Sequence, residues 1–285
     1  MPIALYHQLK QKKMSKTIFI TGASRGFGKI WTEAFLKRGD KVAATVRDLN
    51  ALKDLAKQYG DSLLPIKLDV TNREACFAAV RKAQEHFGVI DILVNNAGYG
   101  LFGTIEETSE QEARNLMETN VFGLLWVTKA VIPIMRQQGK GHIIQVSSLL
   151  GVNPLPLMGM YSASKFAMEA LSETLAIEVK DFGIKVTIVE PNAYATDFTS
   201  VSAVHAQSMK EYDQLKAAVF AGFTDDIFGI PESTAKAICK LIDSPQPPLR
   251  LFLGKIALAM VKQTYQNRLA TWEEWQDVAV EAHGK

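Results

Sequence analysis

Short apolar segments alternate with stretches of helical length along most of this chain. Seven segments of five or six residues, rich in Val and Ile, are typical of strands: 17–21, 41–45, 63–68, 90–94, 142–146, 185–189 and 249–253. The intervening stretches, such as 50–59 and 73–87, are long enough for helices. Strands that alternate with helices form βαβ units, and nearly apolar strands suit a sheet covered on both faces. We therefore expect an α/β fold with a doubly wound parallel sheet, the Rossmann fold.

The domain organisation follows from the segments that depart from this alternation of strands and helices. No repeat, low-complexity tract or linker divides the 285 residues, so we expect one domain over 14–285. Residues 1–13 are typical of a flexible leader, because their lysines follow the apolar residues, unlike those of a signal peptide. Residues 194–229 follow the sixth strand, at the sheet edge where this fold binds ligands, and predict a helical substrate lid. Residues 255–285 predict a helical tail.

Composition argues against several classes of function. The net charge is only +2 and charges of both signs are interspersed, unlike a nucleic-acid-binding face. No segment reaches the roughly 18–20 apolar residues that cross a membrane. Cys76 and Cys239 lie far apart, and the five histidines are scattered, so we expect neither disulfide nor metal site. The low cysteine content favours a reducing compartment, and we expect a cytoplasmic protein.

A glycine-rich loop directly follows the first predicted strand and reads Thr21-Gly22-Ala23-Ser24-Arg25-Gly26-Phe27-Gly28. Glycines allow the backbone to approach a pyrophosphate, and the N-terminus of the next helix offers unpaired N–H groups to it. The alternative is a tight turn without a ligand, which the flanking strand and helix disfavour. We expect cofactor contacts from these residues: Gly22, Ser24, Arg25, Gly26, Phe27 and Gly28.

The end of the second predicted strand bears on the choice of cofactor. An NAD site usually places an acid there for the ribose hydroxyl, whereas an NADP site offers a cation to the 2′-phosphate. Val46 stands where the acid is expected, and Arg47 follows it. Arg25 offers a second guanidinium, whose planar fork matches phosphate. We expect NADP(H); the alternative is that the strand ends later, Asp48 is the acid and Arg47 is merely solvated.

Tyr161 and Lys165 stand four residues apart, on one face of a predicted helix. A phenol titrates near 10, and a nearby ammonium lowers this pKa, so we expect Tyr161 to act as a general acid or base. Ser148 follows the strand 142–146, where its hydroxyl would bind a substrate carbonyl. Ser147 is the neighbouring candidate. The alternatives are a surface helix pair and two serines that only cap the strand.

In their order along the chain, these motifs resemble the short-chain dehydrogenase/reductase family over residues 16–254. The resemblance rests on the loop 21–28, Asp69, Asn95-Asn96-Ala97-Gly98, Asn120, Ser148, Tyr161-x-x-x-Lys165 and residues 191–196. It implies a catalytic tetrad of Asn120, Ser148, Tyr161 and Lys165. In this tetrad Lys165 also holds the nicotinamide ribose, and Asn120 helps to bind a water that relays protons to Lys165.

The resemblance also implies further cofactor contacts. Asp69 and Val70 would contact the adenine, and residues 188–196 would cover the nicotinamide, with Thr196 near its carboxamide. Asn95, Ala97 and Gly98 would line the cofactor and brace the sheet. Pro191-Asn192 departs from the family's usual Pro-Gly. Because Asn tolerates positive φ best after Gly, we expect the fold to persist with an altered nicotinamide pocket.

Residues 43–48 and the long lid resemble the branch with 17β-hydroxysteroid dehydrogenases, retinol dehydrogenases and bacterial carbonyl reductases. A mostly apolar pocket is expected around Ser148 and Tyr161, from Leu149, Leu150, Leu155, Met158, Tyr194 and Phe198. It favours a small hydrophobic ketone or secondary alcohol, unless several of these side chains are only core. We expect an NADP(H)-dependent oxidoreductase and, since family members are commonly dimers or tetramers, a homo-oligomer.

Two other functions share parts of this pattern. A non-catalytic NADP-binding redox sensor could use the same fold, but such proteins often lose part of the tetrad. A sugar-nucleotide epimerase or dehydratase shares the Tyr–Lys pair but differs in glycine spacing. The complete tetrad and the G-x-x-x-G-x-G loop favour the oxidoreductase over both.

Overall fold

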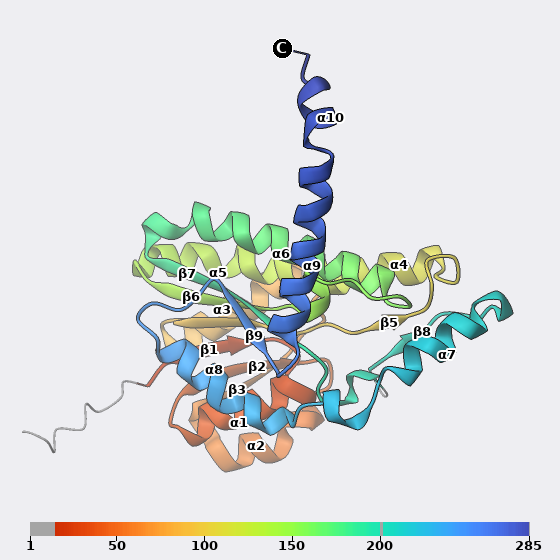
Figure 1. Cartoon of the computed structure of the whole chain (residues 1–285). Coiled ribbons are helices and arrows are strands. Elements are labelled where there is room, and N and C mark those ends of the chain that lie inside the picture. The colour runs from red at the N-terminus through yellow and green to blue at the C-terminus, as the bar shows by residue number, and fades with distance from the viewer. Residues whose placement is uncertain (1–14, 200–201, 285) are drawn as a thin grey trace, which may run out of the picture.

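A computed structural model describes residues 15–199 and 202–284, so the expected leader 1–13 and Met14 lie outside the described residues. Its central sheet is parallel, in the order β3-β2-β1-β4-β6-β7-β9 (Figure 1). The predicted doubly wound sheet is confirmed, with each strand end within two residues of its predicted position. The strands are β1 (Thr17–Ile20), β2 (Lys41–Val46), β3 (Leu63–Lys67), β4 (Ile92–Asn95), β6 (Gly141–Val146), β7 (Ile184–Pro191) and β9 (Arg250–Leu253).

Helices cover both faces of the sheet, because alternate strand residues point to opposite sides. On one side Ile18 and Ile20 pack with Trp31 and with α8, whereas Phe19 packs on the other side with Val131. The first layer contains α1 (Gly26–Lys37), α2 (Lys53–Tyr59) and α8 (Thr234–Asp243). The second contains α3 (Arg73–Phe87), α5 (Leu124–Gln138) and α6 (Gly159–Glu178). This two-sided burial explains why the strands carry few polar residues.

Helix α4 (Glu110–Met117) runs directly into α5 through a π-helical turn, η4 (Glu118–Gly123). Ser109 and Glu112 form a capping box that begins α4. The π turn contains Asn120 and inserts one extra residue into the helical turn, a feature that is frequent at functional sites. Short 3₁₀ turns complete the body: η2 (Leu49–Leu52), η3 (Gly60–Ser62), η5 (Leu149–Gly151), η6 (Lys180–Phe182) and η10 (Pro231–Ser233).

The segment between β7 and α8 is less helical than expected. It contains η7 (Asp197–Thr199), β8 (Val204–His205), η8 (Lys210–Tyr212), α7 (Asp213–Ala221) and η9 (Asp225–Ile227). Strand β8 pairs in parallel with β5 (Leu101–Phe102), and neither strand was predicted, because two residues are too few to establish a period. At the base of the segment, Ala195 donates its backbone N–H to Gly229 and Gly229 donates to Ala193, each at 3.0 Å.

The tail forms α9 (Ala257–Glu274) and α10 (Gln276–Glu281), which project away from the body (Figure 1). The first part of α9 is anchored to the body: Ala257 and Val261 pack against Leu149 and Val152, and Arg268 donates to the Val152 oxygen at 3.0 Å. Among the described helices, none combines the length and the hydrophobicity that crossing a bilayer requires.

Candidate active site

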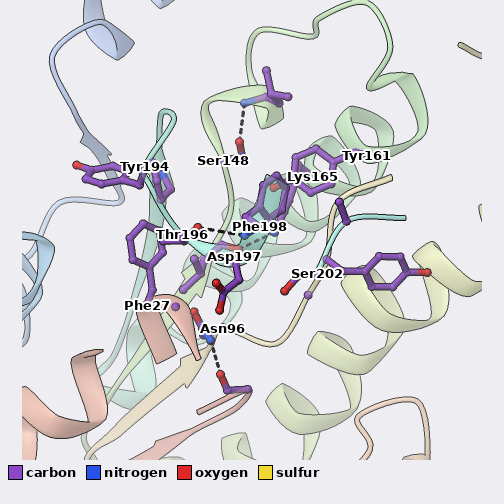
Figure 2. Close-up of a pocket in the computed structure, with 18 of the residues that line it drawn as sticks. Phe27, Asn96, Ser148, Tyr161, Lys165, Tyr194, Thr196, Asp197, Phe198 and Ser202 are labelled. Carbon is purple, nitrogen blue, oxygen red and sulfur yellow. Dashed lines mark hydrogen bonds between the residues drawn. The ribbon is translucent and has the colours of Figure 1, made fainter. Parts of the chain in front are cut away.

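A crevice of about 1200 Å³ opens at the carboxyl ends of the central strands, beneath the segment 194–229 (Figure 2). Most of the predicted site residues line it: Gly22, Ser24, Arg25, Gly26, Phe27, Arg47, Asp69, Val70, Ala97, Gly98, Ser148, Leu149, Leu150, Leu155, Met158, Tyr161, Lys165, Pro191, Asn192, Tyr194, Thr196 and Phe198. Three predicted residues, Gly28, Asn95 and Asn120, are not among the lining residues. No group of three potential metal ligands gathers anywhere in the described parts of the chain.

The glycine-rich loop turns into α1 in the way that close approach to an anion requires. Gly22 and Gly26 have φ of +69° and +52°, values that favour glycine. Gly28 instead packs the helix against the loop, because an added Cβ would lie 2.1 Å from the Gly22 oxygen. Within the described chain, no side chain caps α1 and no acid lies in its first turn. Its N-terminal N–H groups are therefore available to a phosphate.

Asn96 was not predicted as a site residue, yet it holds this loop in place. Its side-chain amide donates to the backbone oxygens of Thr21 at 3.0 Å and Gly22 at 3.1 Å. The neighbouring Asn95 points the other way and donates to Thr128 at 2.8 Å and Gln145 at 2.9 Å. Asn95 therefore braces the sheet but does not line the crevice. The doubled Asn in the sequence indicated the motif without showing which residue faced the ligand.

The cationic end of the crevice is built from the second strand and the glycine-rich loop. Strand β2 ends at Val46, and Val46 and Arg47 both line the crevice, as Arg25 does. The Asp48 carboxylate accepts a hydrogen bond from the Asn50 N–H at 3.0 Å and caps η2. The strand thus ends where the NADP interpretation placed it, and Asp48 is not among the described lining residues.

Tyr161 and Lys165 lie on α6, and both are buried. The Lys165 ammonium donates to the Val146 oxygen at 2.8 Å and lies 5.6 Å from the Tyr161 ring centre. Burial raises the pKa of Tyr161, and a hydrogen bond with Ser148 only partly opposes this rise. The expectation of a lowered phenol pKa is therefore wrong for the protein alone, because desolvation outweighs the neighbouring groups. Burial lowers the pKa of Lys165 to about 8.

The two candidate serines have different partners. The Ser148 oxygen accepts the Leu150 N–H at 3.1 Å, which leaves the hydroxyl proton available beside Tyr161 (Figure 2). The Ser147 hydroxyl donates to Glu169 at 2.5 Å. Ser148 is therefore the serine whose hydroxyl can donate to a substrate oxygen.

Asn120 lies behind the crevice wall, 2% exposed. Its side-chain oxygen accepts the Tyr99 N–H at 3.1 Å, and its amide donates to the Tyr99 oxygen at 3.0 Å and to Ser164 at 3.1 Å. Gly98 separates it from the crevice: a Cβ there would lie 3.0 Å from the Asn120 oxygen and 4.0 Å from the Lys165 nitrogen. The structure thus brings Asn120 near Lys165, with its amide committed to the backbone of Tyr99.

Aromatic and aliphatic side chains from the segment 194–229 line the crevice next to Tyr161. The Phe198 ring lies 5.3 Å from the Tyr161 ring, and the Tyr194 ring meets Phe27 edge-on at 5.2 Å (Figure 2). Sequence reasoning missed several apolar lining residues: Tyr99, Phe102, Val219, Phe223, Ile227, Phe228, Ile256 and Met260. Most of these come from the lid and the tail, which carry no motif.

The unusual Asn192 fits without positive φ, since Leu157 is the only non-glycine residue of the described chain that adopts it. The Asn192 amide donates to the Ile227 oxygen at 3.1 Å and so ties the end of β7 to the end of the lid. Its side-chain oxygen occupies the space next to Gly254, where a Cβ would lie 1.2 Å away. A glycine at 254 thus accommodates the departure from Pro-Gly.

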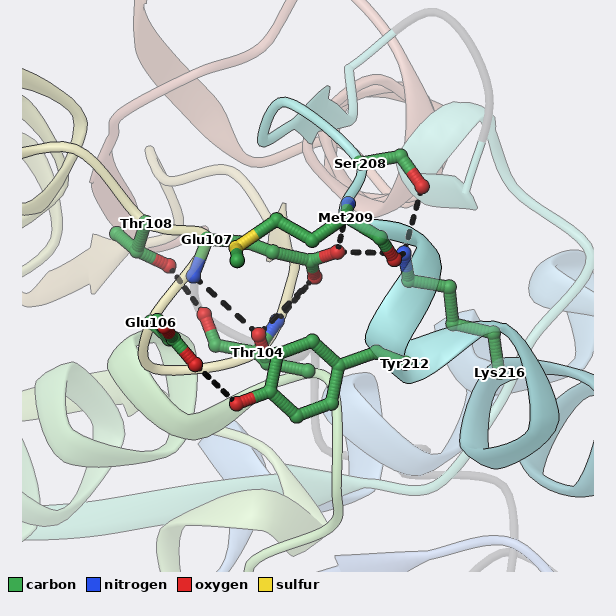
Figure 3. A network of polar contacts seen from close by, with 8 residues as sticks. All are labelled: Thr104, Glu106, Glu107, Thr108, Ser208, Met209, Tyr212 and Lys216. Carbon is green, nitrogen blue, oxygen red and sulfur yellow. Dashed lines mark hydrogen bonds and ion pairs between the residues drawn. The ribbon is translucent and has the colours of Figure 1, made fainter.

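A polar network around Glu107 ties the segment 194–229 to residues 104–107 (Figure 3). One oxygen of Glu107 accepts from the Lys216 ammonium at 2.5 Å and from the Met209 N–H at 2.7 Å. The other accepts from Thr104, and Tyr212 donates to Glu106 at 2.5 Å. These bonds, that to Lys216 above all, lower the pKa of Glu107 to about 2.

Comparison with known proteins supports the interpretation of this crevice. The chain matches the short chain dehydrogenase family over residues 16–206. It is 36% identical to an oxidoreductase of Botryotinia fuckeliana, over 94% of this chain and 99% of that protein. It is 37% identical to a 3-ketodihydrosphingosine reductase of Bacteroides thetaiotaomicron, over 84% of this chain and 88% of that protein.

Solved structures agree with these relatives. A short-chain dehydrogenase from Streptomyces avermitilis has a TM-score of 0.86 at 37% identity, covering 94% of this chain and 98% of its own. An alcohol dehydrogenase from Thermococcus sibiricus, complexed with 5-hydroxy-NADP, has a TM-score of 0.72 at 28% identity, covering 86% and 98%. A Burkholderia phymatum enzyme in complex with NAD has a TM-score of 0.76 at 26% identity, covering 90% and 95%. The chain belongs to the short-chain dehydrogenase/reductase family of oxidoreductases.

Proposed function

We propose that this protein is an NADP(H)-dependent oxidoreductase that interconverts a hydrophobic ketone and a secondary alcohol, with Tyr161 as general acid or base. The observation that carries the proposal is the arrangement of one crevice. Tyr161, Ser148 and Lys165 lie along its wall, and the glycine-rich loop with the free helix N-terminus lies at its other end. A dinucleotide on this loop would extend toward the Tyr161 hydroxyl.

The preference for NADP(H) rests on charge. Arg25 and Arg47 line the crevice at the end of β2, and Asp48 is engaged in capping η2. Two guanidinium groups favour a 2′-phosphate over a ribose hydroxyl. Several related structures hold NADP or NADPH, and others hold NADH or NAD, so the argument depends on these arginines.

When bound, the nicotinamide supplies or accepts the hydride. Ser148 would donate its hydroxyl proton to the substrate oxygen and stabilise the charge that develops there. Tyr161 would give its proton to that oxygen during reduction. A raised pKa keeps the phenol protonated at neutral pH, which is the form that donates. Lys165 would hold the ribose and lower the cost of a transient phenolate.

The substrate end of the crevice favours an apolar molecule. Leu149, Leu150 and Met158 line it from the body, and Phe198 lines it from the lid. One relative bears the name 3-ketodihydrosphingosine reductase, which is consistent with a ketone as substrate. The segment 194–229 would then act as the substrate lid of a single domain.

Two further expectations accompany the proposal. The described cysteines, Cys76 and Cys239, are free thiols, which supports a reducing compartment such as the cytoplasm. Large apolar side chains are exposed on α6, among them Phe166 and Leu171, and Phe122 is exposed on η4, directly before α5. Such exposure supports a homo-oligomer that pairs these helices.

The decisive experiment compares the wild type with Tyr161→Phe. We expect kcat for ketone reduction to fall by about 10²–10⁴-fold, because the proton donor is lost. NADPH affinity, measured by fluorescence titration, should stay within about threefold, and NADH run in parallel reports the cofactor preference. Near-normal turnover by the variant would reject the role of Tyr161.

A further inference from the structure

Behind the crevice wall, a cluster of charged side chains joins α6 to the last two strands of the sheet. Arg250 on β9 donates to Glu169 at 2.8 Å, to Glu173 at 3.0 Å and to Glu190 on β7. Glu169 is 3% exposed and Glu190 is fully buried. Buried carboxylates are costly and rare, so this cluster calls for an explanation that the catalytic residues alone do not provide.

Glu169 also reaches the catalytic residues. Its other oxygen accepts the Ser147 hydroxyl at 2.5 Å. One helical turn earlier on α6, Lys165 donates to the Val146 oxygen at 2.8 Å. Lys165 and Glu169 therefore hold consecutive residues at the end of β6, directly before Ser148.

The contact with Ser147 depends on a glycine. A Cβ on Gly151 would lie 1.9 Å from the Glu169 oxygen and 2.6 Å from the Ser147 oxygen. Since Cβ atoms do not approach other heavy atoms so closely, any larger residue at 151 would displace Glu169 or Ser147. The backbone thus leaves room for this hydrogen bond.

Lys165 needs a counter-charge because it is only 6% exposed. Its hydrogen bonds go to two neutral acceptors, the Val146 oxygen and, at 3.7 Å, the Met168 sulfur. Glu169 favours the charged form of Lys165 and opposes the burial that lowers its pKa. Tyr161, one turn earlier on α6, is another titratable group close to the Lys165 ammonium. Strand β6 presents the Val146 backbone oxygen to this ammonium.

The charges around Glu169 favour its ionised form over that of Glu190. Glu169 accepts hydrogen bonds from both Ser147 and Arg250, which stabilise a carboxylate. Glu190 accepts only from Arg250, and one of its oxygens is without a partner in the described chain. Burial raises the pKa of Glu190 to about 8, so Glu190 holds its proton more tightly than an exposed glutamate does and competes less with Glu169 and the more exposed Glu173 for the charge of Arg250.

We infer that Glu169 is a positioning residue of the active site. Its carboxylate supplies the buried counter-charge that keeps Lys165 protonated, and its bond to Ser147 anchors the end of β6 beside Ser148. The kinetic consequence rests on the proposed function, whereas the counter-charge is a property of the chain itself.

The first test follows Lys165 directly by NMR. In protein labelled with [13C]lysine, the Lys165 Cε signal, assigned by its absence from Lys165→Met, is titrated with pH. Glu169→Gln should lower the midpoint by about one pH unit or more, since an opposite charge is removed from a buried site. Glu169→Asp should restore most of this shift. Glu173→Gln is the matched control, because it removes an exposed partner of Arg250 on the same helix and should leave the midpoint unchanged.

The second test measures kcat/KM against pH with NADPH and a ketone. The alkaline limb should move to lower pH in Glu169→Gln and stay in place in Glu173→Gln. An unchanged NMR midpoint in Glu169→Gln overturns the inference. A shifted midpoint in a protein that reduces no ketone rejects the proposed function and retains the role of Glu169. If Glu169→Gln does not fold, Ser147→Ala should shift the midpoint in the same direction by less, and no shift there overturns the inference.

Discussion

Glu169, in the body, and Glu107, against the segment 194–229, are both almost fully buried, and each pairs with a cation. The side chain of Glu169 is 3% exposed and pairs with Arg250; that of Glu107 is 1% exposed and pairs with Lys216 (Figure 3). Burial raises the pKa of Glu169, whereas hydrogen bonds lower that of Glu107 to about 2. The pKa of a buried glutamate is thus raised at one site and lowered at the other.

The difference lies in the donors around each carboxylate and in the elements that carry them. Glu107 accepts from two backbone N–H groups besides Lys216, and its partners belong to loops and to α7. Glu169 shares its cation with Glu190 and Glu173, on packed strands and a helix. At pH values above its ordinary pKa of 4.5, ionised Glu107 stabilises the contact between its own loop and the segment 194–229. This contribution is lost as pH falls from 4.5 to about 2. The contact of Glu107 with Lys216 therefore persists at neutral pH, whereas the cluster around Arg250 contains Glu190, whose pKa burial raises to about 8.

The largest effect should follow removal of the shared cation. Arg250→Met removes the guanidinium that pairs with the buried Glu169 and Glu190, and breaking a buried pair costs about 3–5 kcal/mol in comparable cases. We expect Tm to fall by about 10 °C in a calorimetric scan at pH 7. Arg114→Met is the control, because Arg114 pairs with Glu110 on the surface and its loss should change Tm by less than about 2 °C. Equal Tm values for both variants would show that the body cluster contributes no stability.

Neither network was accessible from the sequence, although the fold was. The strands were predicted because apolar runs of five or six residues recur between helical stretches, and burial on both faces requires that pattern. Glu169 and Arg250 stand 81 positions apart, and no local pattern links them. Glu107 and Lys216 are likewise 109 positions apart. Pairings of this kind depend on tertiary packing, which periodicity does not encode.

The candidate site was predictable to the extent that its residues sit in local motifs. The glycine-rich loop, apart from Gly28, lines the crevice as expected, as do Ser148, Tyr161 and Lys165. Asn95 was assigned to it because the motif does not show which of two adjacent side chains faces inward. The direction of the Tyr161 pKa shift was missed for another reason. Burial dominates it, and burial is a property of the folded chain.

The ion pair between Glu107 and Lys216 is tested by Lys216→Met, which keeps the aliphatic stem of the side chain and removes the ammonium. Without this cation the lid should open more often, so the KM for a ketone should rise about tenfold, equivalent to about 1.4 kcal/mol of closure. Limited proteolysis within 194–229 should also accelerate, while Tm changes little. Lys210→Met, at an exposed position of the same segment, is the control. Proteolysis at the wild-type rate in Lys216→Met would show that the ion pair with Glu107 does not hold this segment in place.

The last prediction concerns how the stability that Glu190 contributes depends on pH. The folded pKa of Glu190, about 8, lies above its ordinary value of 4.5, so the folded state binds the proton more tightly than the unfolded chain does. Stability from this residue is therefore full below pH 4.5 and declines as pH rises from 4.5 to 8. Glu190→Gln keeps an acceptor for Arg250 and removes the titration. The difference in Tm between the variant and the wild type should accordingly grow in favour of the variant as pH rises from 5 to 8. Glu107→Gln, measured in parallel, should show no such trend, because its titration lies below this range. A Tm difference between Glu190→Gln and the wild type that does not change with pH would mean that Glu190 is ionised in the folded protein. The environments of Glu169 and Glu107 would then differ in their hydrogen-bond geometry and not in the titration of a neighbouring group.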